Sequence, residues 1–203
     1  FAFSNIDVGL LQLKDQQGIE SFMKYFVEND CMPDFYSFQC FHNDYSNDYR
    51  STLRAVASHG TEPAMLSDDE NYLHNNIRAI FRAIRKYDDR GCPVILDTWN
   101  ASIWQRDLRS DTCFKSAFIF KNVLENAEAL SGFGYWNLSD LFEEIHASTR
   151  LFHGGYGLMT YNGIPKAGFN AFVLLKHLGS QLVQRGDGWF ATCSPDGSVQ
   201  IAL

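Results

Sequence analysis

Short apolar segments of strand length alternate with amphipathic segments of helix length along most of this chain. Strands that are joined through helices run parallel, so the alternation predicts a parallel α/β sheet. A flavodoxin-like open sheet would give a similar pattern, but no Gly-rich phosphate-binding loop follows any of the strands. The predicted strands are residues 1–9, 34–39, 94–98 and 132–136, and a polar run at 42–48 indicates a long loop.

Four helices are expected between and after these strands. Ser67 and Glu70 have the spacing of a capping box, which predicts the start of a helix that presents Leu73, Ile77 and Ile80 on one face. Apolar residues at helical spacing predict three more helices at residues 18–29, 111–129 and 165–178. In the helix at 111–129, we expect the inward-facing residues to be Phe114, Ala117, Phe118 and Leu124.

The last segment has a different pattern. Residues 188–194 and 199–203 are strand-like and flank Pro195, Asp196 and Gly197, which are typical turn residues, so they predict a β-hairpin. The chain ends within the second of these strands. We therefore expect it to be a piece of a longer protein.

The composition argues against nucleic acid and anionic membranes as partners of this chain. The chain has 203 residues, is 45% apolar and carries a net charge of −7, with no run rich in Lys or Arg. It can bury a core, and it has no electrostatic footprint for nucleic acid or for an anionic membrane. No 18-residue apolar run predicts a membrane span. The five widely spaced cysteines indicate reduced thiols and a cytoplasmic location.

Residues 134–144 and 152–158 carry the strongest functional signal. They join the end of an apolar strand to an aromatic, Trp136, to two carboxylates, Glu143 and Glu144, and to a glycine-rich loop after His153. An indole that stacks on a sugar ring, beside carboxylates that accept from its hydroxyls, is the chemistry of a sugar pocket. No spacing of cysteines and histidines indicates a metal, and we expect neither a metal nor a cofactor.

This run resembles the last barrel strand and following loop of the family-39 glycoside hydrolases, the retaining β-xylosidases and related enzymes. The resemblance continues in order along the chain, through Pro33 to Ser37, Val94 to Ser102, Asp111-Thr112, and Ile164-Pro165-Lys166. It implies that residues 1–180 form the C-terminal half of a (β/α)₈ TIM barrel, strands five to eight. Residues 181–203 would then begin an accessory β-sandwich.

The resemblance also implies where catalysis would take place. Retaining enzymes use two carboxyl groups about 5 Å apart. The family's acid/base lies in an Asn-Glu-Pro motif, which this sequence does not contain. Its nucleophile lies in a Thr-Glu-aromatic-Asn-Thr-Ser motif, and the matching residues begin with Asp97, so that Thr98 occupies the glutamate position. A threonine without a base cannot replace that carboxylate.

Two further residues bear on this position. Asp97 is a substitute nucleophile only if a bulge re-aims it, because neighbouring residues of a strand face opposite ways. The family's sixth-strand histidine falls at Gln39, whereas His42 is more simply a loop histidine. Two differences from the family's residues at one catalytic centre, Thr98 and Gln39, favour a reduced or lost hydrolytic function.

Each remaining candidate has a simpler interpretation. Trp136 is either a sugar-stacking residue or core, and the Glu143–Glu144 pair either accepts from sugar hydroxyls or is solvated surface. His153 is either a substrate contact or a structural loop residue. Trp99 and Asn100 follow the seventh strand, where a barrel carries its rim loops, and are further candidates.

Three functional classes remain open from the sequence. One is a catalytically silent module that binds or senses a xylose-type sugar within a larger protein. Barrels that resemble this family occur behind helix-turn-helix domains in AraC-type transcriptional regulators, where DNA contact belongs to the fused domain. The second is an active β-xylosidase completed by an N-terminal half, and the third a structural remnant without a ligand. Half a barrel exposes strand edges, so we also expect two copies to pair.

Overall fold

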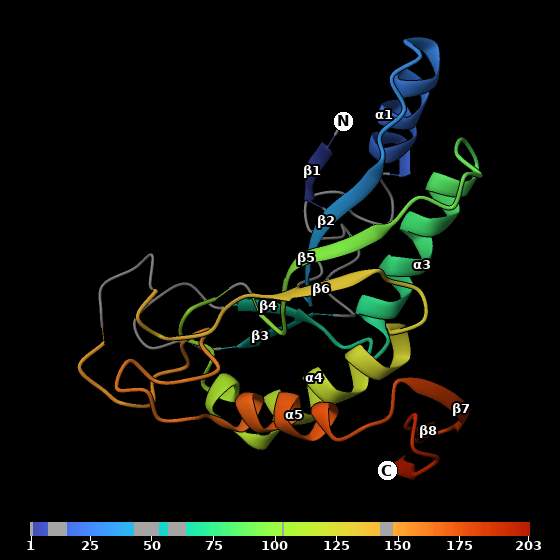
Figure 1. Ribbon diagram of the computed structural model, residues 1–203. Coiled ribbons are helices and arrows are strands. Elements are labelled where there is room, and N and C mark those ends of the chain that lie inside the picture. Colours follow the sequence, from blue (N-terminus) through green and yellow to red (C-terminus); the bar gives the residue numbers. More distant parts are fainter. Residues whose placement is uncertain (1, 8–15, 43–52, 57–63, 103, 143–147) are drawn as a thin grey trace.

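The computed structural model of the chain describes residues 2–7, 16–42, 53–56, 64–102, 104–142 and 148–203 (Figure 1). Its main sheet has four strands, all parallel, in the order β1-β2-β5-β6. This confirms the parallel α/β architecture that the alternating pattern predicts. The strands are β1 (Ala2–Asp7), β2 (Phe35–Phe41), β5 (Val94–Asn100) and β6 (Gly132–Tyr135).

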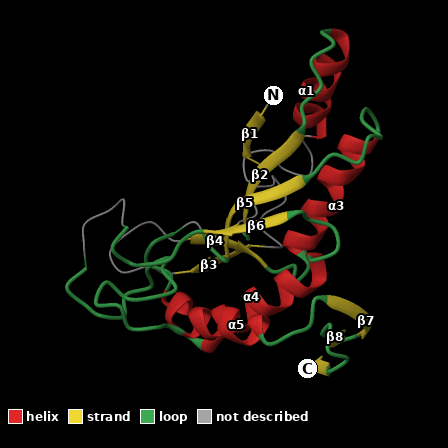
Figure 2. Cartoon of the chain, in the orientation of Figure 1, coloured by secondary structure: helices red, strands yellow, loops and turns green. Residues whose placement is uncertain are grey.

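The helices come between and after these strands, at the four expected places. They are α1 (Gln16–Glu28), α3 (Tyr72–Arg85), α4 (Cys113–Asn126) and α5 (Ala167–Lys176), and a short 3₁₀ turn, η1 (Leu108–Asp111), precedes α4. Figure 2 shows α3 and α4 following one another along the same side of the main sheet. None of the helices in the described part of the chain is both long enough and apolar enough to cross a membrane.

The hydrophobic core lies between the helices and one face of the sheet. Alternate residues of β2, namely Tyr36, Phe38 and Cys40, are buried in it. Helix α3 contributes the predicted residues Leu73, Ile77 and Ile80, which are buried, and Ile84 is buried on the same helix. Burial of one face of each element against the other stabilises the arrangement, because it removes apolar surface from water.

The segment before α3 differs from the prediction. Two short strands, β3 (Leu53–Val56) and β4 (Ala64–Ser67), form an antiparallel hairpin that the sequence pattern did not indicate. Ser67 ends β4, and its hydroxyl accepts from the backbone N–H of Asp69 at 3.1 Å. Helix α3 begins only at Tyr72 and has no side-chain cap. The predicted capping box is therefore wrong, because Ser67 closes a local turn instead.

The buried face of α4 also differs. Phe114 and Ala117 are exposed, whereas Lys115, Asn122 and Asn126 are buried. The two asparagines satisfy their amides within the helix, where Asn122 donates to the carbonyl of Phe118 and Asn126 to that of Asn122, both at 2.8 Å. Local hydrogen bonds of this kind allow polar residues to be buried at positions where apolar ones were expected.

The C-terminal segment forms a separate antiparallel sheet. Its strands are β7 (Gln181–Gly186), β8 (Trp189–Cys193) and β9 (Val199–Ala202), in that order. The β8–β9 pairing confirms the predicted hairpin, while β7 was not predicted. The change from parallel to antiparallel structure comes after α5. None of the five cysteines, all of which are described, forms a disulfide.

Candidate active site

The face of the main sheet opposite the helices carries the residues that the sequence singled out; we call it the inner face. On β2 it comprises Ser37 and Gln39, which alternate with the core residues. On β6, Gly132 and Gly134 alternate with Phe133 and Tyr135, which pack against the core. A Cβ at Gly134 would lie 2.2 Å from the carbonyl oxygen of Asp97, so β6 approaches β5 more closely there than a side chain would allow.

A break in strand register lies at the centre of the inner face. Phe38 pairs with Leu96, but the next residue of β2, Gln39, pairs with Thr98, which leaves Asp97 as an extra residue on β5. Such a bulge re-aims side chains. Asp97 accepts a hydrogen bond from the Ser37 hydroxyl at 2.7 Å instead of facing the helices. Strict alternation had put Asp97 on the helix side, and the bulge is the physical reason for the difference.

Asp97 has one carboxylate oxygen left over. Oδ2 receives the Ser37 hydroxyl, while Oδ1 is buried and has no hydrogen-bond partner within the described part of the chain. A buried carboxylate oxygen without a partner is costly, and a donor brought by a ligand or by water would satisfy it. Asp97 is therefore placed to accept from a bound hydroxyl group.

Thr98 and Gln39 lie next to each other at the carboxyl ends of β5 and β2. They are partners across the parallel strands, and both are partly exposed. The two positions at which the family's nucleophile and histidine are expected are thus adjacent in space. They bring together a hydroxyl and an amide, which can hydrogen-bond to a sugar but supply no carboxylate.

Trp136 follows β6 directly and is partly exposed. Its ring lies edge-on to that of Phe142, with 5.1 Å between centroids, and Phe142 is itself 56% exposed. An accessible indole beside a second aromatic ring, at the carboxyl end of a parallel strand, has the position and shape to stack on the apolar face of a sugar.

The position of Trp99 corrects our expectation. Its side chain has no exposed surface and packs on the helix side among Phe118, Phe133 and Tyr135, with centroid distances of 5.9, 6.1 and 5.3 Å. The bulge at Asp97 and Thr98 turns the next residue of β5 into the core. Trp99 is therefore a core residue and cannot touch a ligand on the inner face.

Asn100 is also buried, with 1% of its surface exposed, so it is not a rim contact. Its amide nitrogen donates to the carbonyl of Trp136 and, at 3.4 Å, to that of Tyr156. Its oxygen accepts from the ammonium of Lys115 and from the backbone N–H of Ala101. Burial lowers the pKa of Lys115 to about 7. Asn100 and Lys115 together hold the backbone that carries Trp136.

His153 is buried as well, with 1% of its surface exposed, and its Nδ1–H donates to the carbonyl of Arg150 at 2.9 Å. The glycine-rich loop that follows lies against Asp140, whose carboxylate accepts from the backbone N–H of Gly157 at 2.7 Å. Lys166 pairs with Asp140 at 3.1 Å and with Asp111 at 2.6 Å. The structural interpretation of His153 is therefore the one that fits, because nothing of the ring is accessible.

Glu143 and Glu144 lie outside the described residues, and their part in the site stays a prediction. Within the described residues, no group of three or more His, Cys, Asp or Glu side chains could hold a metal ion. His42, which the sequence indicates as a loop histidine, lines a pocket on the helix side of the sheet together with α4 residues.

Comparison with known proteins gives a consistent family. The model of the glycosyl hydrolases family 39 matches residues 15–190. A β-xylosidase from Geobacillus stearothermophilus is 34% identical over 111 residues, which are 55% of this chain and 22% of that protein. Another, from Caldicellulosiruptor saccharolyticus, is 37% identical over 93 residues, 45% of this chain and 19% of that protein.

Solved structures agree with the sequence relatives. The structure of a monomeric β-xylosidase from Caulobacter crescentus is similar with a TM-score of 0.75 and 26% identity, over 90% of this chain and 36% of that one. A family-39 enzyme from Xanthomonas axonopodis pv. citri has the same fold, with a TM-score of 0.72 at 21% identity, over 87% of this chain and 33% of that one. The matches span about a fifth of the curated relatives' length.

The four-stranded parallel sheet is thus part of a (β/α)₈ barrel-like fold. The family model covers nearly the whole chain, and the two curated relatives described above are β-xylosidases. This chain belongs to the glycosyl hydrolases family 39.

Proposed function

We propose that the chain is a β-xylosidase-like carbohydrate-binding domain that has lost hydrolytic activity and senses a sugar within a larger protein. In this proposal β1, β2, β5 and β6 are strands five to eight of the barrel, residues 1–180 form its second half, and residues 181–203 begin an accessory sandwich. The similarity to about a third of a Caulobacter β-xylosidase supports this assignment.

The ligand that we propose is xylose or a xylo-oligosaccharide, bound at the carboxyl ends of β2, β5 and β6. Trp136 would stack on one face of the ring, since its indole is accessible beside Phe142. Gln39 and Thr98 would hydrogen-bond to hydroxyls, and the unpartnered Oδ1 of Asp97 would accept from another. Glu143 and Glu144 would complete the polar rim.

The observation that carries the loss of activity is Thr98. It occupies the position of the family's nucleophile and lies beside Gln39, so the two side chains that meet at this point include no carboxylate. Retaining hydrolysis requires two carboxyl groups about 5 Å apart. A site that keeps an aromatic platform and hydrogen-bonding groups but lacks the nucleophile suits recognition rather than turnover.

A sensing role in an AraC-type transcriptional regulator is consistent with such a site. The chain's net charge of −7 and its lack of a basic run assign any DNA contact to a fused domain. In this setting sugar binding at the inner face would bias the state of the attached domain.

One observation favours a second candidate, an active retaining glycosidase. The bulge places the Asp97 carboxylate on the inner face with one oxygen unpartnered, so it could attack an anomeric carbon if an N-terminal half supplied the acid/base. In this alternative Asp97 replaces the glutamate at the neighbouring position.

The test combines binding and turnover in the intact protein. Calorimetric titration with xylose, xylobiose and arabinose measures binding, and an aryl β-xyloside measures hydrolysis by the wild type and by Thr98→Glu, Asp97→Asn and Thr98→Val. We expect binding without turnover in the wild type, and weaker binding in Asp97→Asn, because the amide keeps one oxygen to accept from Ser37 and places an NH₂ donor where the second acceptor was. Thr98→Val is the matched control for Thr98→Glu, since it removes the hydroxyl without adding charge.

Turnover by the wild type would contradict the proposal. If that turnover disappears in Asp97→Asn but persists in Thr98→Val, the second candidate is correct and Asp97 is the nucleophile. Absence of both binding and turnover would make the domain a structural remnant.

A further inference from the structure

A second pocket lies on the helix side of the sheet, between helix α4 and the residues that follow β2 and β4. Its walls include His42, Asp68, Phe114, Phe118 and Asn122, and its volume is about 400 Å³. This is at the lower end of the roughly 300–1,000 Å³ of small-molecule sites. Phe118 packs against Trp99, which lies in the core on the face opposite Trp136. The pocket is therefore separate from the inner face.

Two buried acceptors in this pocket have no hydrogen-bond partner within the described residues: Nδ1 of His42 and Oδ1 of Asn122. The other ring nitrogen of His42, Nε2, donates to the Ser67 carbonyl at 3.1 Å, which leaves the lone pair on Nδ1. Burial lowers the pKa of His42 to about 4, so the ring is neutral near pH 7. Asn122, 1% exposed, uses its amide nitrogen on the Phe118 carbonyl. An occupant that donates hydrogen bonds would satisfy both acceptors.

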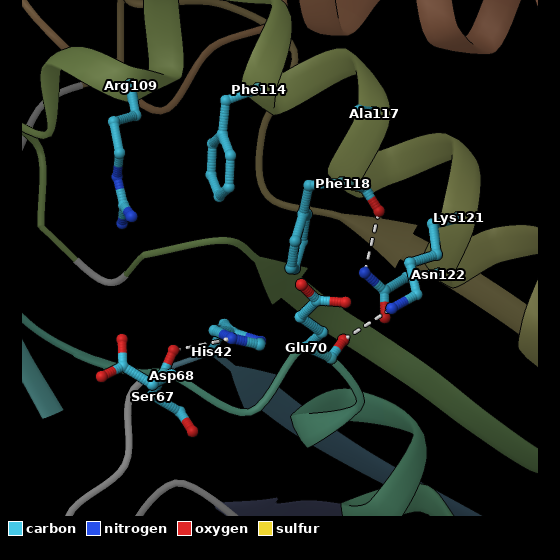
Figure 3. A pocket seen from close by; sticks show the side chains of 10 residues that line it. All are labelled: His42, Ser67, Asp68, Glu70, Arg109, Phe114, Ala117, Phe118, Lys121 and Asn122. Atoms are coloured by element: carbon cyan, nitrogen blue, oxygen red, sulfur yellow. Dashed lines mark hydrogen bonds between the residues drawn. The ribbon is translucent and has the colours of Figure 1, made fainter. Parts of the chain in front are cut away.

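The pocket also has an aromatic wall. The rings of Phe114 and Phe118 project from α4 toward His42, which follows β2, and Asp68, which follows β4 (Figure 3). They are stacked with 6.2 Å between centroids, and Phe114 is 38% exposed. The guanidinium of Arg109 lies 4.6 Å from the centroid of the Phe114 ring. An occupant with an apolar face would cover this exposed aromatic surface.

The charges around the pocket are balanced. Two carboxylates, Asp68 and Glu70, line it together with two cations, Arg109 and Lys121. The Lys121 ammonium is also engaged, because it donates to the Glu70 carbonyl at 3.0 Å. A lining with no net charge and a neutral His42 favours a neutral occupant over an ion.

We propose that this pocket binds a neutral polyhydroxy molecule of the size of one sugar ring. Its hydroxyls donate to Nδ1 of His42 and Oδ1 of Asn122, and its C–H face lies against Phe114. This site does not depend on a sugar being bound at the inner face. It gives the domain a binding position outside the barrel interior.

The test follows the ¹⁵N resonances of the His42 ring in the intact protein during titration with xylose. Tetrahydropyran, a ring of similar size without hydroxyls, serves as the matched control. We expect xylose to shift Nδ1 with a dissociation constant on the order of 1 mM, and tetrahydropyran to leave it unchanged. Equal effects of the two rings would show that the pocket takes an apolar ring without using hydroxyl donors, and no effect of either would show that it holds water only. Either result would overturn the proposal.

Variants localise the binding. His42→Phe keeps a ring against Tyr72 and Phe118 but removes the acceptor, and we expect it to weaken this site about fivefold, followed through the Asn122 amide. Phe114→Ala alters an exposed residue and should weaken it by a similar factor, whereas Phe22→Ala, an exposed residue of α1, should not.

The two sites can fail separately. Trp136→Ala should leave the His42 shift intact even if it abolishes binding at the inner face. Loss of the His42 shift in Trp136→Ala would mean that the pocket merely responds to the inner face, and the proposal would be wrong. Unchanged affinity in both His42→Phe and Phe114→Ala would contradict it equally.

Discussion

Trp99 and Trp136 occupy the ends of neighbouring parallel strands, yet they lie in opposite environments. The backbone N–H of Trp136 donates to the carbonyl of Trp99 at 3.1 Å, so their main chains are joined directly. One indole has no exposed surface and packs among core aromatics, while the other is partly exposed beside Phe142. The two residues are of the same type and both lie at a strand end, so neither property determines which indole is accessible to a ligand. The face of the sheet determines it, and the bulge at Asp97 and Thr98 turns Trp99 toward the core.

The largest expected effect is on stability. Trp99→Ala should lower the free energy of unfolding by about 3–5 kcal/mol, because it leaves a cavity within a buried aromatic cluster. Trp136→Ala, at a partly exposed position, should cost less than about 1 kcal/mol. Urea denaturation of both variants measures the difference. Similar losses of unfolding free energy in the two variants would contradict the assignment of Trp99 to the core and Trp136 to an accessible position.

The next prediction concerns Lys115, which donates to Asn100, the residue that hydrogen-bonds to the backbone of Trp136. A lysine in the unfolded chain has a pKa of 10.5, and burial lowers that of Lys115 to about 7 in the folded chain. Between these values the unfolded state binds more protons, so stability should rise as the pH rises from about 7 to about 10.5. The gain should be on the order of 3 kcal/mol, allowing for the response of neighbouring groups. The charged groups around Lys115 are Asp107, Arg109, Asp111 and Lys166.

Midpoints of urea denaturation, measured across this pH range, test whether the free energy of unfolding rises with pH. Lys115→Met should remove most of the rise in stability, because it replaces the titrating group with an apolar chain of similar length. Lys176→Met, on the last turn of α5, provides the control and should leave the pH dependence unchanged. An equal slope in the wild type and Lys115→Met would assign the dependence to other groups.

A smaller effect should appear in sugar affinity. Trp136→Ala should weaken xylose binding at the inner face about tenfold, through loss of stacking, and Trp136→Phe should recover part of it. Trp189→Ala, in β8 of the separate antiparallel sheet, is the matched control. Calorimetric titration gives the three affinities. If Trp189→Ala weakened binding as much as Trp136→Ala did, stacking at the inner face would not be the cause.

The smallest effect concerns association of this 203-residue chain. The strands β1 and β6 each pair with only one neighbour in the described sheet, and unpaired edges attract other strands. We expect two copies to pair across these edges and the inner face, which would give about twice the monomer mass in light scattering. Trp136→Arg should weaken this pairing, while a monodisperse wild-type monomer would refute it.

The sequence predicted the elements whose signal is local and apolar. The strands β2 and β5 are short buried runs, and α3 repeats Leu73, Ile77 and Ile80 on one face, so periodicity was enough to find them. The hairpin of β3 and β4 was missed, since its segments are short and its pairing is antiparallel within a parallel pattern.

The site was predicted less well, because its geometry depends on contacts distant in sequence. The bulge at Asp97 arises from pairing with β2, and no pattern within residues 94–98 reveals it. Asn100 was expected among the rim residues, but it is buried and its side-chain oxygen accepts from the ammonium of Lys115. Trp136 alone among the strand-end candidates could be placed by counting two-residue periods along its own strand.

Gly134 has a consequence for the depth of the inner face. A side chain there would collide with the main chain of β5 at Asp97, so the strand must stay bare at that step. Gly132, two residues earlier, is bare as well, which leaves Trp136 as the first bulky group along that edge. The indole therefore projects beside a stretch of backbone without side chains. The spacing between β5 and β6, rather than the size of any side chain, limits how closely a ring bound next to Trp136 can approach the sheet.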